Sequence, residues 1–198
     1  PLPKELIYEL LPTVSSLPSR LSVRSFAANL ASKLNYLESH AGKKSPFFGV
    51  IKTHTNPTGT VGSTSLQKVI MNSRSNGALR DFSKLEDVEE RSLDLIANFY
   101  GAVMDVFPEA WSGMGPRTSR LKHSVGIIAM GYAMEIAYAI YGCRSREEFA
   151  SKLECLAQDN ICAWTSGTWY FSADEVRGWD RLQNTPPDIR MLSEYNTN

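Results

Sequence analysis

A glycine-rich, basic stretch is the first place in this chain where chemistry could occur. The segment GMGPRTSRLKH contains three cations, Arg117, Arg120 and Lys122, and leads directly into an apolar helical pattern. Backbone N–H groups at the N-terminus of a helix attract anions. The GxxxxGK[ST] order of a P-loop is absent, so this is not a nucleotide-binding loop of that kind. We therefore expect Arg117, Arg120 and Lys122 to contact a phosphate or a DNA backbone; an ordinary loop between helices is the alternative.

A second basic stretch, GKKSPFFGVIKTH, interleaves cations with aromatic residues. Its lysines are Lys43, Lys44 and Lys52, and Phe47 and Phe48 lie between them. Basic residues interleaved with aromatic ones suit a surface on which single-stranded bases stack. A strand beside a hydrophobic core needs aromatic residues as well, so packing is the alternative. We expect the three lysines to contact nucleic acid.

Residues that could perform catalysis are scarce. The sequence contains no nucleophile elbow, no HExxH motif, no paired carboxylates and no Cys–His arrangement. Its three cysteines form no CxxC pair, and its three histidines show no ligand spacing relative to them. We therefore predict no catalytic residue, no metal site and no cofactor. Free thiols are typical of a reducing compartment, so we expect a cytoplasmic protein.

Glu135 is the one unusual titratable residue, because it lies inside the most apolar segment, Val125 to Tyr141. Such a group sometimes marks an active site, and more often it is paired or lies at a wet edge. Five aromatic residues near the C-terminus could line a pocket or could fasten the last helix to the body. These residues are Trp164, Trp169, Tyr170, Phe171 and Trp179. A nucleotide-binding or enzymatic role centred on Glu135 and this cluster is one alternative.

Charge is distributed in blocks, although the formal net charge is zero. Residues 1–84 contain 11 Lys/Arg and 4 Asp/Glu, whereas residues 85–116 contain 1 and 7. Residues 117–146 contain 5 and 1, and residues 147–198 contain 4 and 9. A neutral chain is not a generally basic nucleic-acid binder, but one surface could still be locally basic. The blocks could also neutralise one another across the fold.

Hydrophobic spacing predicts that helices position these residues. We expect helices over residues 23–40, 63–73, 85–107, 120–141, 145–158 and 186–195, a short helix over 3–12, and a strand near 47–54. Ser145 with Glu148 forms a capping-box pattern, and Pro186 follows the capping residue Thr185. The predicted fold class is mainly α, a helical bundle-like domain with one or two short strands near residues 47–54.

The length suits one domain, which we predict over residues 1–198, with residues 1–20 forming an N-terminal helix and linker. The apolar segment falls short of the ~18–20 residues of a membrane span and contains Glu135, so we expect a buried core helix and no membrane. No secretory signal pattern begins the sequence. Because the first residue is Pro1, we expect the C-terminal part of a longer chain.

Several segments, taken in order, resemble DGQHR-domain proteins, the family that includes the DndB-like regulators linked to DNA phosphorothioation and antiviral defence. The segments are FAANLASKLNYLESHAGKKSPFFGVIK, GSTSLQKVI, IANFYGAVMDVFPEAW with RLKHSVGIIAM, and WDRLQNTPPDIRMLSEY. They are spread over most of residues 21–195. The DGQHR signature, and the half that contains it, are absent from this sequence. The resemblance implies the C-terminal helical portion of such a protein, and no signature residue is carried over.

The resemblance implies a non-enzymatic, DNA-associated role in transcription regulation or defence. The domain would bind the DNA backbone or assemble with the N-terminal DGQHR half of the same protein. A second hypothesis is a protein-interaction scaffold whose apolar surface packs against that half or against a second copy, giving a homo-oligomer. DNA is thus the expected partner under the first hypothesis, and another protein surface under the second.

Overall fold

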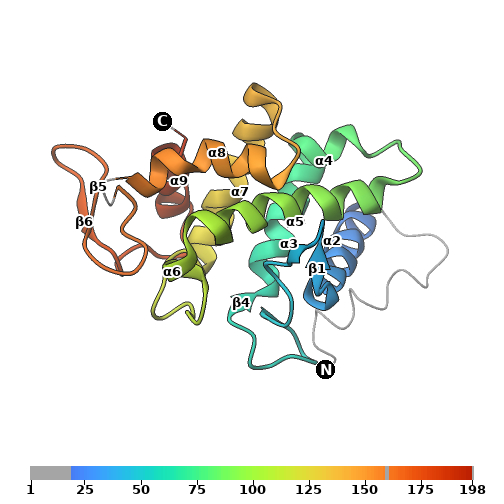
Figure 1. The fold of residues 1–198 in the computed structure, drawn as a ribbon, viewed down its shortest axis with the longest axis horizontal. Helices are drawn as coiled ribbons and strands as arrows, with labels where there is room; N and C mark the ends of the chain where they lie inside the picture. The colour runs from blue at the N-terminus through green and yellow to red at the C-terminus, as the bar shows by residue number, and fades with distance from the viewer. Residues whose placement is uncertain (1–18, 159–160, 198) are drawn as a thin grey trace. The chain divides into compact units, whose positions relative to one another are not determined.

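The computed structural model describes residues 19–158 and 161–197, and these residues are mainly helical (Figure 1). The mainly α fold class predicted from the sequence is confirmed. The chain divides into two compact units, residues 1–97 and 98–198, which we describe separately. The single domain over residues 1–198 stays a prediction, and the short helix expected over residues 3–12 lies outside the described residues.

Two packed helices form the base of the first unit. α2 (Ser19–Tyr36) and α3 (Ser63–Asn76) bury apolar stripes against each other, as their helical spacing predicts. Four leucine and isoleucine side chains of this contact have no exposed surface: Leu30, Leu34, Leu66 and Ile70. The short α4 (Ala78–Asp81) follows α3, and the first half of α5 (Val88–Val106) completes the unit.

Both ends of α2 differ from the prediction. The helix begins at Ser19, inside the predicted linker, because the following arginine and leucine both favour helix. It ends at Tyr36 rather than at residue 40, because the Asn35 carbonyl accepts a hydrogen bond from Gly49 N–H at 2.9 Å. The Asn35 side chain accepts a second one, from Ile51 N–H at 3.0 Å. A carbonyl bonded to a distant loop does not continue the helical ladder.

A two-residue hairpin follows α2. β1 (Ser39–His40) pairs antiparallel with β2 (Lys43–Lys44), and the turn residues Ala41 and Gly42 have φ of +49° and +75°. Positive φ at both central positions is the geometry of a type I′ turn, which matches the twist of a hairpin. Glycine adopts it freely, whereas for Ala41 it costs about 1 kcal/mol.

The strand predicted near residues 47–54 is short. β3 (Ile51–Lys52) pairs in parallel with β4 (Val61–Gly62), and the residues just before it form turns. Asn56 closes the connecting loop, because its side-chain amide donates to the carbonyls of Gly49 and Ile51, both at 2.9 Å. Gly59 lies against the Ile51 backbone, where any Cβ would collide with it.

The second unit is organised around α7 (Ser124–Tyr141), a helix with a largely buried surface. Its alanine strip lies in the interior, since Ala129, Ala133 and Ala137 are all buried. α8 (Arg146–Ala157) and α9 (Pro186–Tyr195) pack against it. α7 is long and apolar enough to cross a membrane, and more than half of it is buried within the structure.

An ion pair between a buried arginine and an exposed aspartate links α8 to the second half of α5. α8 begins with the predicted capping box between Ser145 and Glu148. Arg146, the residue after Ser145, is buried and donates two hydrogen bonds to Asp105 of α5, each 2.7 Å long. Its guanidinium fits beside Gly101, where a Cβ would lie 2.8 Å from Nε. Pro108 ends α5 as predicted and opens the short α6 (Pro108–Trp111).

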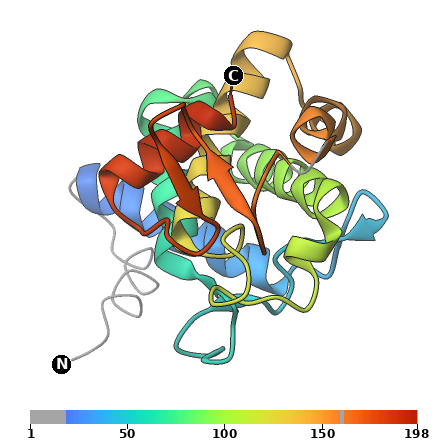
Figure 2. The ribbon, with the colours of Figure 1, turned by 90° about the vertical axis from the view of Figure 1, so that its left-hand side faces the viewer.

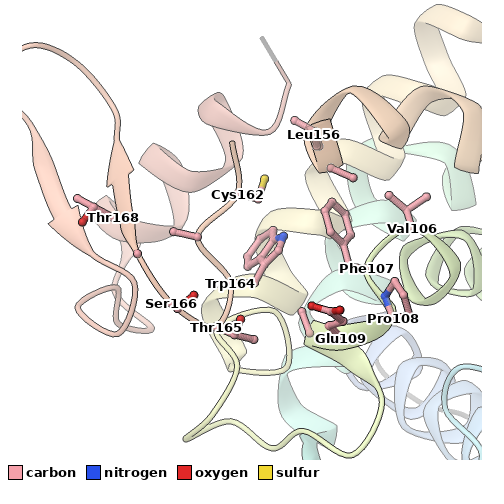
Figure 3. Close-up of a pocket in the computed structure, with 14 residues that line it drawn as sticks. Val106, Phe107, Pro108, Glu109, Leu156, Cys162, Trp164, Thr165, Ser166 and Thr168 are labelled. Carbon is pink, nitrogen blue, oxygen red and sulfur yellow. The ribbon is translucent and has the colours of Figure 1, made fainter. Parts of the chain in front are cut away.

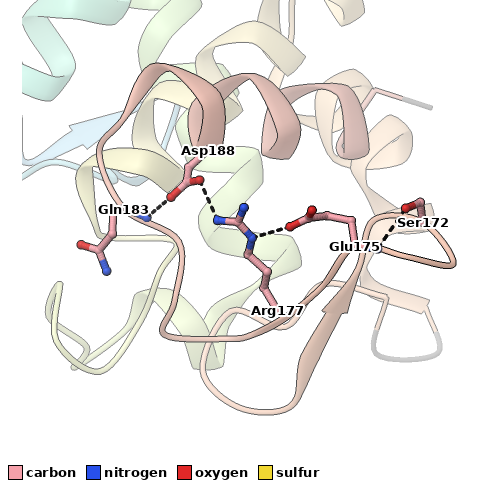
Figure 4. A network of polar contacts seen from close by, with 5 residues as sticks. All are labelled: Ser172, Glu175, Arg177, Gln183 and Asp188. Carbon is pink, nitrogen blue, oxygen red and sulfur yellow. Dashed lines mark hydrogen bonds and ion pairs between the residues drawn. The ribbon is translucent and has the colours of Figure 1, made fainter.

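The aromatic segment near the C-terminus contains a hairpin, although strands were predicted only near residues 47–54. β5 (Thr168–Tyr170) and β6 (Val176–Gly178) pair antiparallel and lie beside α9 (Figure 2). Arg177 connects the two, because it donates to Glu175 at 2.6 Å and to the buried Asp188 of α9 at 2.8 Å (Figure 4). Asp188 also accepts a hydrogen bond from Gln183 N–H at 2.7 Å. The hairpin and the last helix are thus tied together by one carboxylate.

Aromatic rings complete the attachment of α9. The Tyr195 ring meets Trp169 and Phe171 edge-on, with centroid distances of 5.6 and 5.3 Å. Trp164 meets Trp169 at 4.9 Å, and Tyr170 is exposed. The expectation that this cluster fastens the last helix is therefore confirmed for Trp169 and Phe171.

We predict that Gly59→Ala destabilises the protein by about 1–3 kcal/mol, because the added Cβ must displace the Ile51 backbone and the β3–β4 pairing. Chemical denaturation followed by circular dichroism measures the change. His54→Ala, an exposed change in the same loop, is the control and should have a near-zero effect. Equal denaturation midpoints for the two variants would contradict the close approach at Gly59.

Candidate nucleic-acid interface and pocket

The first candidate site is the lysine loop, which we define as residues 39–52. Lys43, Lys44 and Lys52 are all exposed on it. Phe47 is fully buried and anchors the loop, whereas Phe48 is 40% exposed. The packing alternative therefore holds for Phe47, and Phe48 is the aromatic side chain of this loop that could stack on a base.

Hydrogen bonds hold the backbone of the lysine loop. Asn35 is only 4% exposed and fixes the loop at both Gly49 and Ile51. The Ser45 N–H donates to the Glu38 carbonyl at 3.1 Å, beside the hairpin. Loops positioned in this way by a rigid scaffold often bear binding residues. The lysines are thus presented by a fixed backbone.

The acidic start of α5 neutralises part of the basic block in the same unit. Glu89 forms an ion pair with Lys33 of α2 and accepts a hydrogen bond from Asn29 at 3.2 Å. Asp94 lies 3.7 Å from His40, at the edge of the lysine loop. The neutralisation expected from the alternating charge blocks is therefore confirmed for Lys33.

In the second unit, the basic segment before α7 forms a loop, as one alternative predicted. The N–H groups of Thr118 and Ser119 both donate to the Gly115 carbonyl, at 3.1 and 2.9 Å. This turn presents Arg117 in an exposed position. Arg117 is therefore accessible to an anion.

The other two cations of this segment are used within the unit. Arg120 donates to the Asp180 carbonyl, and its guanidinium lies 6.0 Å from the centroid of the Trp179 ring. Lys122 is only 3% exposed, and its ammonium lies 5.6 Å from the centroid of the Trp111 ring. A cation held over an aromatic face in this way is stabilised where water is excluded. The expectation that Lys122 contacts DNA is corrected by its burial, and we leave it out of the interface.

The N-terminus of α7 is partly occupied by the protein itself. Val125 N–H donates to His123 Nδ1 at 3.3 Å. Burial and the positive charge of Arg120 lower the pKa of His123, so the neutral ring can accept this bond. Gly126 packs so closely on the backbone of Arg120 and Leu121 that a Cβ would collide with it. The helix start thus supports the loop, and one of its N–H groups is not available to an anion.

The second unit also contains a pocket that sequence spacing did not reveal (Figure 3). Its volume is about 460 Å³, and it lies between the junction of α5 with α6 and the segment that follows α8. Among its described lining residues, Glu109 bears the only charge. Side chains that define its character are Phe107, Glu109, Leu156, Cys162, Trp164 and Thr168.

The thiol that lines this pocket is not in its nucleophilic form at neutral pH. Burial, with a contribution from nearby Cys155, raises the pKa of Cys162 to about 12, so its thiol stays protonated at neutral pH. Trp164 is 3% exposed, and its indole nitrogen has no hydrogen-bond partner among the described residues. Figure 3 shows this nitrogen on the side of the ring that faces Phe107. The pocket therefore offers an unused donor and a carboxylate.

Glu135, the titratable residue singled out in the sequence, does not line this pocket. It is half-buried on α7 near Tyr100, and burial together with the charge of Glu135 raises the Tyr100 pKa. The Tyr100 hydroxyl donates to the Ile127 carbonyl at 2.7 Å. In the described part of the chain, no three His, Cys, Asp or Glu side chains gather where they could hold a metal ion. The alternative centred on Glu135 stays a prediction.

Comparisons of the chain with protein-family models, with curated proteins and with solved structures find no match. The resemblance to DGQHR-domain proteins therefore stays a prediction. Function has to be argued from the exposed cations and from the pocket.

We predict that iodoacetamide at neutral pH modifies Cys155 well before the other two thiols. Cys155 is exposed, whereas burial raises the pKa of both Cys143 and Cys162 and keeps them in the unreactive thiol form. Raising the pH should bring Cys162 into reaction only in strongly alkaline solution, since a raised pKa delays deprotonation. Peptide mass spectrometry of the folded protein measures the order. Equal labelling of Cys155 and Cys162 at neutral pH would show that the pKa of the pocket thiol is not raised.

Proposed function

We propose that this protein is a non-enzymatic, DNA-associated domain that contacts the nucleic-acid backbone through the lysine loop and Arg117. The observation that supports this most directly is the exposure of Lys43, Lys44 and Lys52 on one hydrogen-bonded loop. Phosphate contacts by such cations supply affinity without reading sequence. A regulatory or defence role in the cytoplasm is the setting that the DGQHR resemblance suggests.

The fixed backbone of the lysine loop also supports this proposal. The buried Phe47 and the Asn35 hydrogen bonds hold the backbone before any ligand arrives, so binding does not have to order the loop first. Phe48, exposed between the lysines, gives a face for an unpaired base. We therefore expect single-stranded DNA to bind more tightly than a duplex of equal length.

We predict that the double change Lys43→Ala/Lys44→Ala weakens DNA binding and lowers the slope of log affinity against log salt by about two, because each lost phosphate contact removes about one. Fluorescence anisotropy over a salt series measures this. The control is Lys68→Ala/Lys84→Ala, which removes two exposed lysines of the same unit outside the loop. Identical salt slopes for both double variants would exclude the lysine loop as the contact.

We predict that Arg117→Ala and Arg120→Ala act differently. Arg117→Ala removes an exposed cation, so it should lower the slope of log affinity against log salt by about one, with little change in stability. Arg120→Ala should instead lower the melting temperature, because it removes the bond to the Asp180 carbonyl and the contact with Trp179. Salt-dependent anisotropy and thermal melts of both variants test this. A salt slope unchanged by Arg117→Ala would remove that residue from the interface.

A second candidate function, a protein-interaction scaffold, is favoured by one apolar surface. Tyr132 and Ile140 lie eight residues apart on α7 and are 42% and 67% exposed, with the half-buried Ile136 between them. Residues with this spacing share one face of a helix. Such a face would pack against the expected DGQHR half or against a second copy of the chain.

We predict under this alternative that the protein sediments as a dimer and that Ile140→Glu makes it a monomer, because a buried, unpaired carboxylate opposes association. Val176→Glu, a change of an exposed apolar residue on β6, is the control and should leave the dimer intact. Sedimentation velocity measures both. A monomeric parent protein would contradict self-association through this face.

A further inference from the structure

We propose that the pocket of the second unit binds a nucleobase, with the Trp164 indole donating a hydrogen bond to the base and the Glu109 carboxylate accepting one from it. The base could belong to a free nucleoside or to a nucleic-acid strand, and the experiment below distinguishes these sources. The pocket is formed entirely by residues 106–168, so the proposal does not depend on the lysine loop.

The unused donor is the first argument. Trp164 is 97% buried, and its Nε1 has no acceptor among the described residues, although buried N–H groups are nearly always paired. Its ring is fixed by edge-on contacts with Phe107 at 6.0 Å and with Trp169 at 4.9 Å. A carbonyl or ring-nitrogen acceptor on a ligand would satisfy this donor after a small shift of the side chains that cover it, because Nε1 has almost no accessible surface of its own.

The charge of the lining is the second argument. Glu109 is exposed at the pocket, and no lysine or arginine occurs among the described lining residues. An anionic ligand would therefore be repelled, and a phosphate would have to remain outside. The carboxylate instead accepts hydrogen bonds from N–H groups, such as the ring imide, amide or amino groups of a base.

The size and the lining of the pocket also suit a nucleobase. A volume of about 460 Å³ is within the range of small-ligand pockets and is sufficient for a base with its sugar. Phe107 and Leu156 give apolar surface, and Thr165, Ser166 and Thr168 give hydroxyl groups at the same pocket. The ligand should therefore be planar and largely apolar, with an acceptor and an N–H donor on its edge. A simple ammonium ion would match Glu109 but would leave the Trp164 donor unused.

The test is isothermal titration of the whole chain with the four deoxynucleosides and with a single-stranded oligonucleotide. Trp164→Phe removes the indole donor and should weaken binding about tenfold, the effect of one lost hydrogen bond to a desolvated partner. Trp179→Phe is the control: it removes an indole N–H and the same ring volume, but Trp179 does not line the pocket, and its ring lies against Arg120. Its affinity should equal that of the parent.

A second pair of variants keeps the test independent of tryptophan packing. Glu109→Gln preserves the size of the side chain and should weaken binding, whereas Glu154→Gln, an exposed change on α8, should not. Thermal melts verify that all four variants are folded.

Five results would decide the proposal. Nucleoside binding that depends on Trp164 supports a pocket for free nucleosides, and oligonucleotide binding alone with the same dependence supports capture of a base from a strand. Absence of any binding at millimolar nucleoside and micromolar oligonucleotide, or equal affinities of Trp164→Phe and Trp179→Phe, would overturn the proposal. Oligonucleotide binding that requires Lys43 and Lys44 but not Trp164 would overturn the pocket while leaving the proposed function intact.

Discussion

The hydrogen bond from Ile51 N–H to the buried side chain of Asn35 is the constraint on which the first unit depends. The buried backbone N–H and C=O groups of a loop need hydrogen-bond partners. Strand pairing supplies them here only for the two residues of β3. Asn35 supplies both an amide oxygen and a carbonyl, at the cost of ending α2 early. The exposure of the lysines is a consequence, because the chain must turn outward between Tyr36 and the buried Phe47.

In the second unit, the corresponding constraint is the cover of α7. A helix this apolar needs neighbours on most of its surface, and polar contacts attach several of them: Arg146 to Asp105, Arg177 to Asp188, and Arg120 to the Asp180 carbonyl. Cations that look available in the sequence are thus already used. The number of basic residues in the sequence therefore overstates the surface that can contact phosphate. Only cations whose side chains are exposed in the fold can do so.

Local signals predicted the helices well, and long-range contacts explain the failures. The Ser145 capping box and the left-handed Gly142 both lie where their residue types require them. The end of α2 could not be predicted, because its cause is the hydrogen bonding of Asn35 to Gly49 and Ile51, which lie farther along the chain in a loop. The β5–β6 hairpin was missed because its aromatic strand lacks polar alternation, and the burial of Lys122 depends on Trp111, which belongs to another element.

The sequence offered Trp164 as a residue that could line a pocket, and it does; the role of Glu109 could not be predicted, because only the fold brings it to the same pocket. The chemistry of this pocket is complementary to that of the lysine loop. The loop offers exposed cations and one exposed aromatic ring, which suit a phosphate backbone, whereas the pocket has a carboxylate and a buried donor, which exclude phosphate and suit a base edge. Backbone contacts position a strand and base contacts discriminate. The two proposed contacts lie in separate units, so substitutions can alter either one without changing the residues of the other.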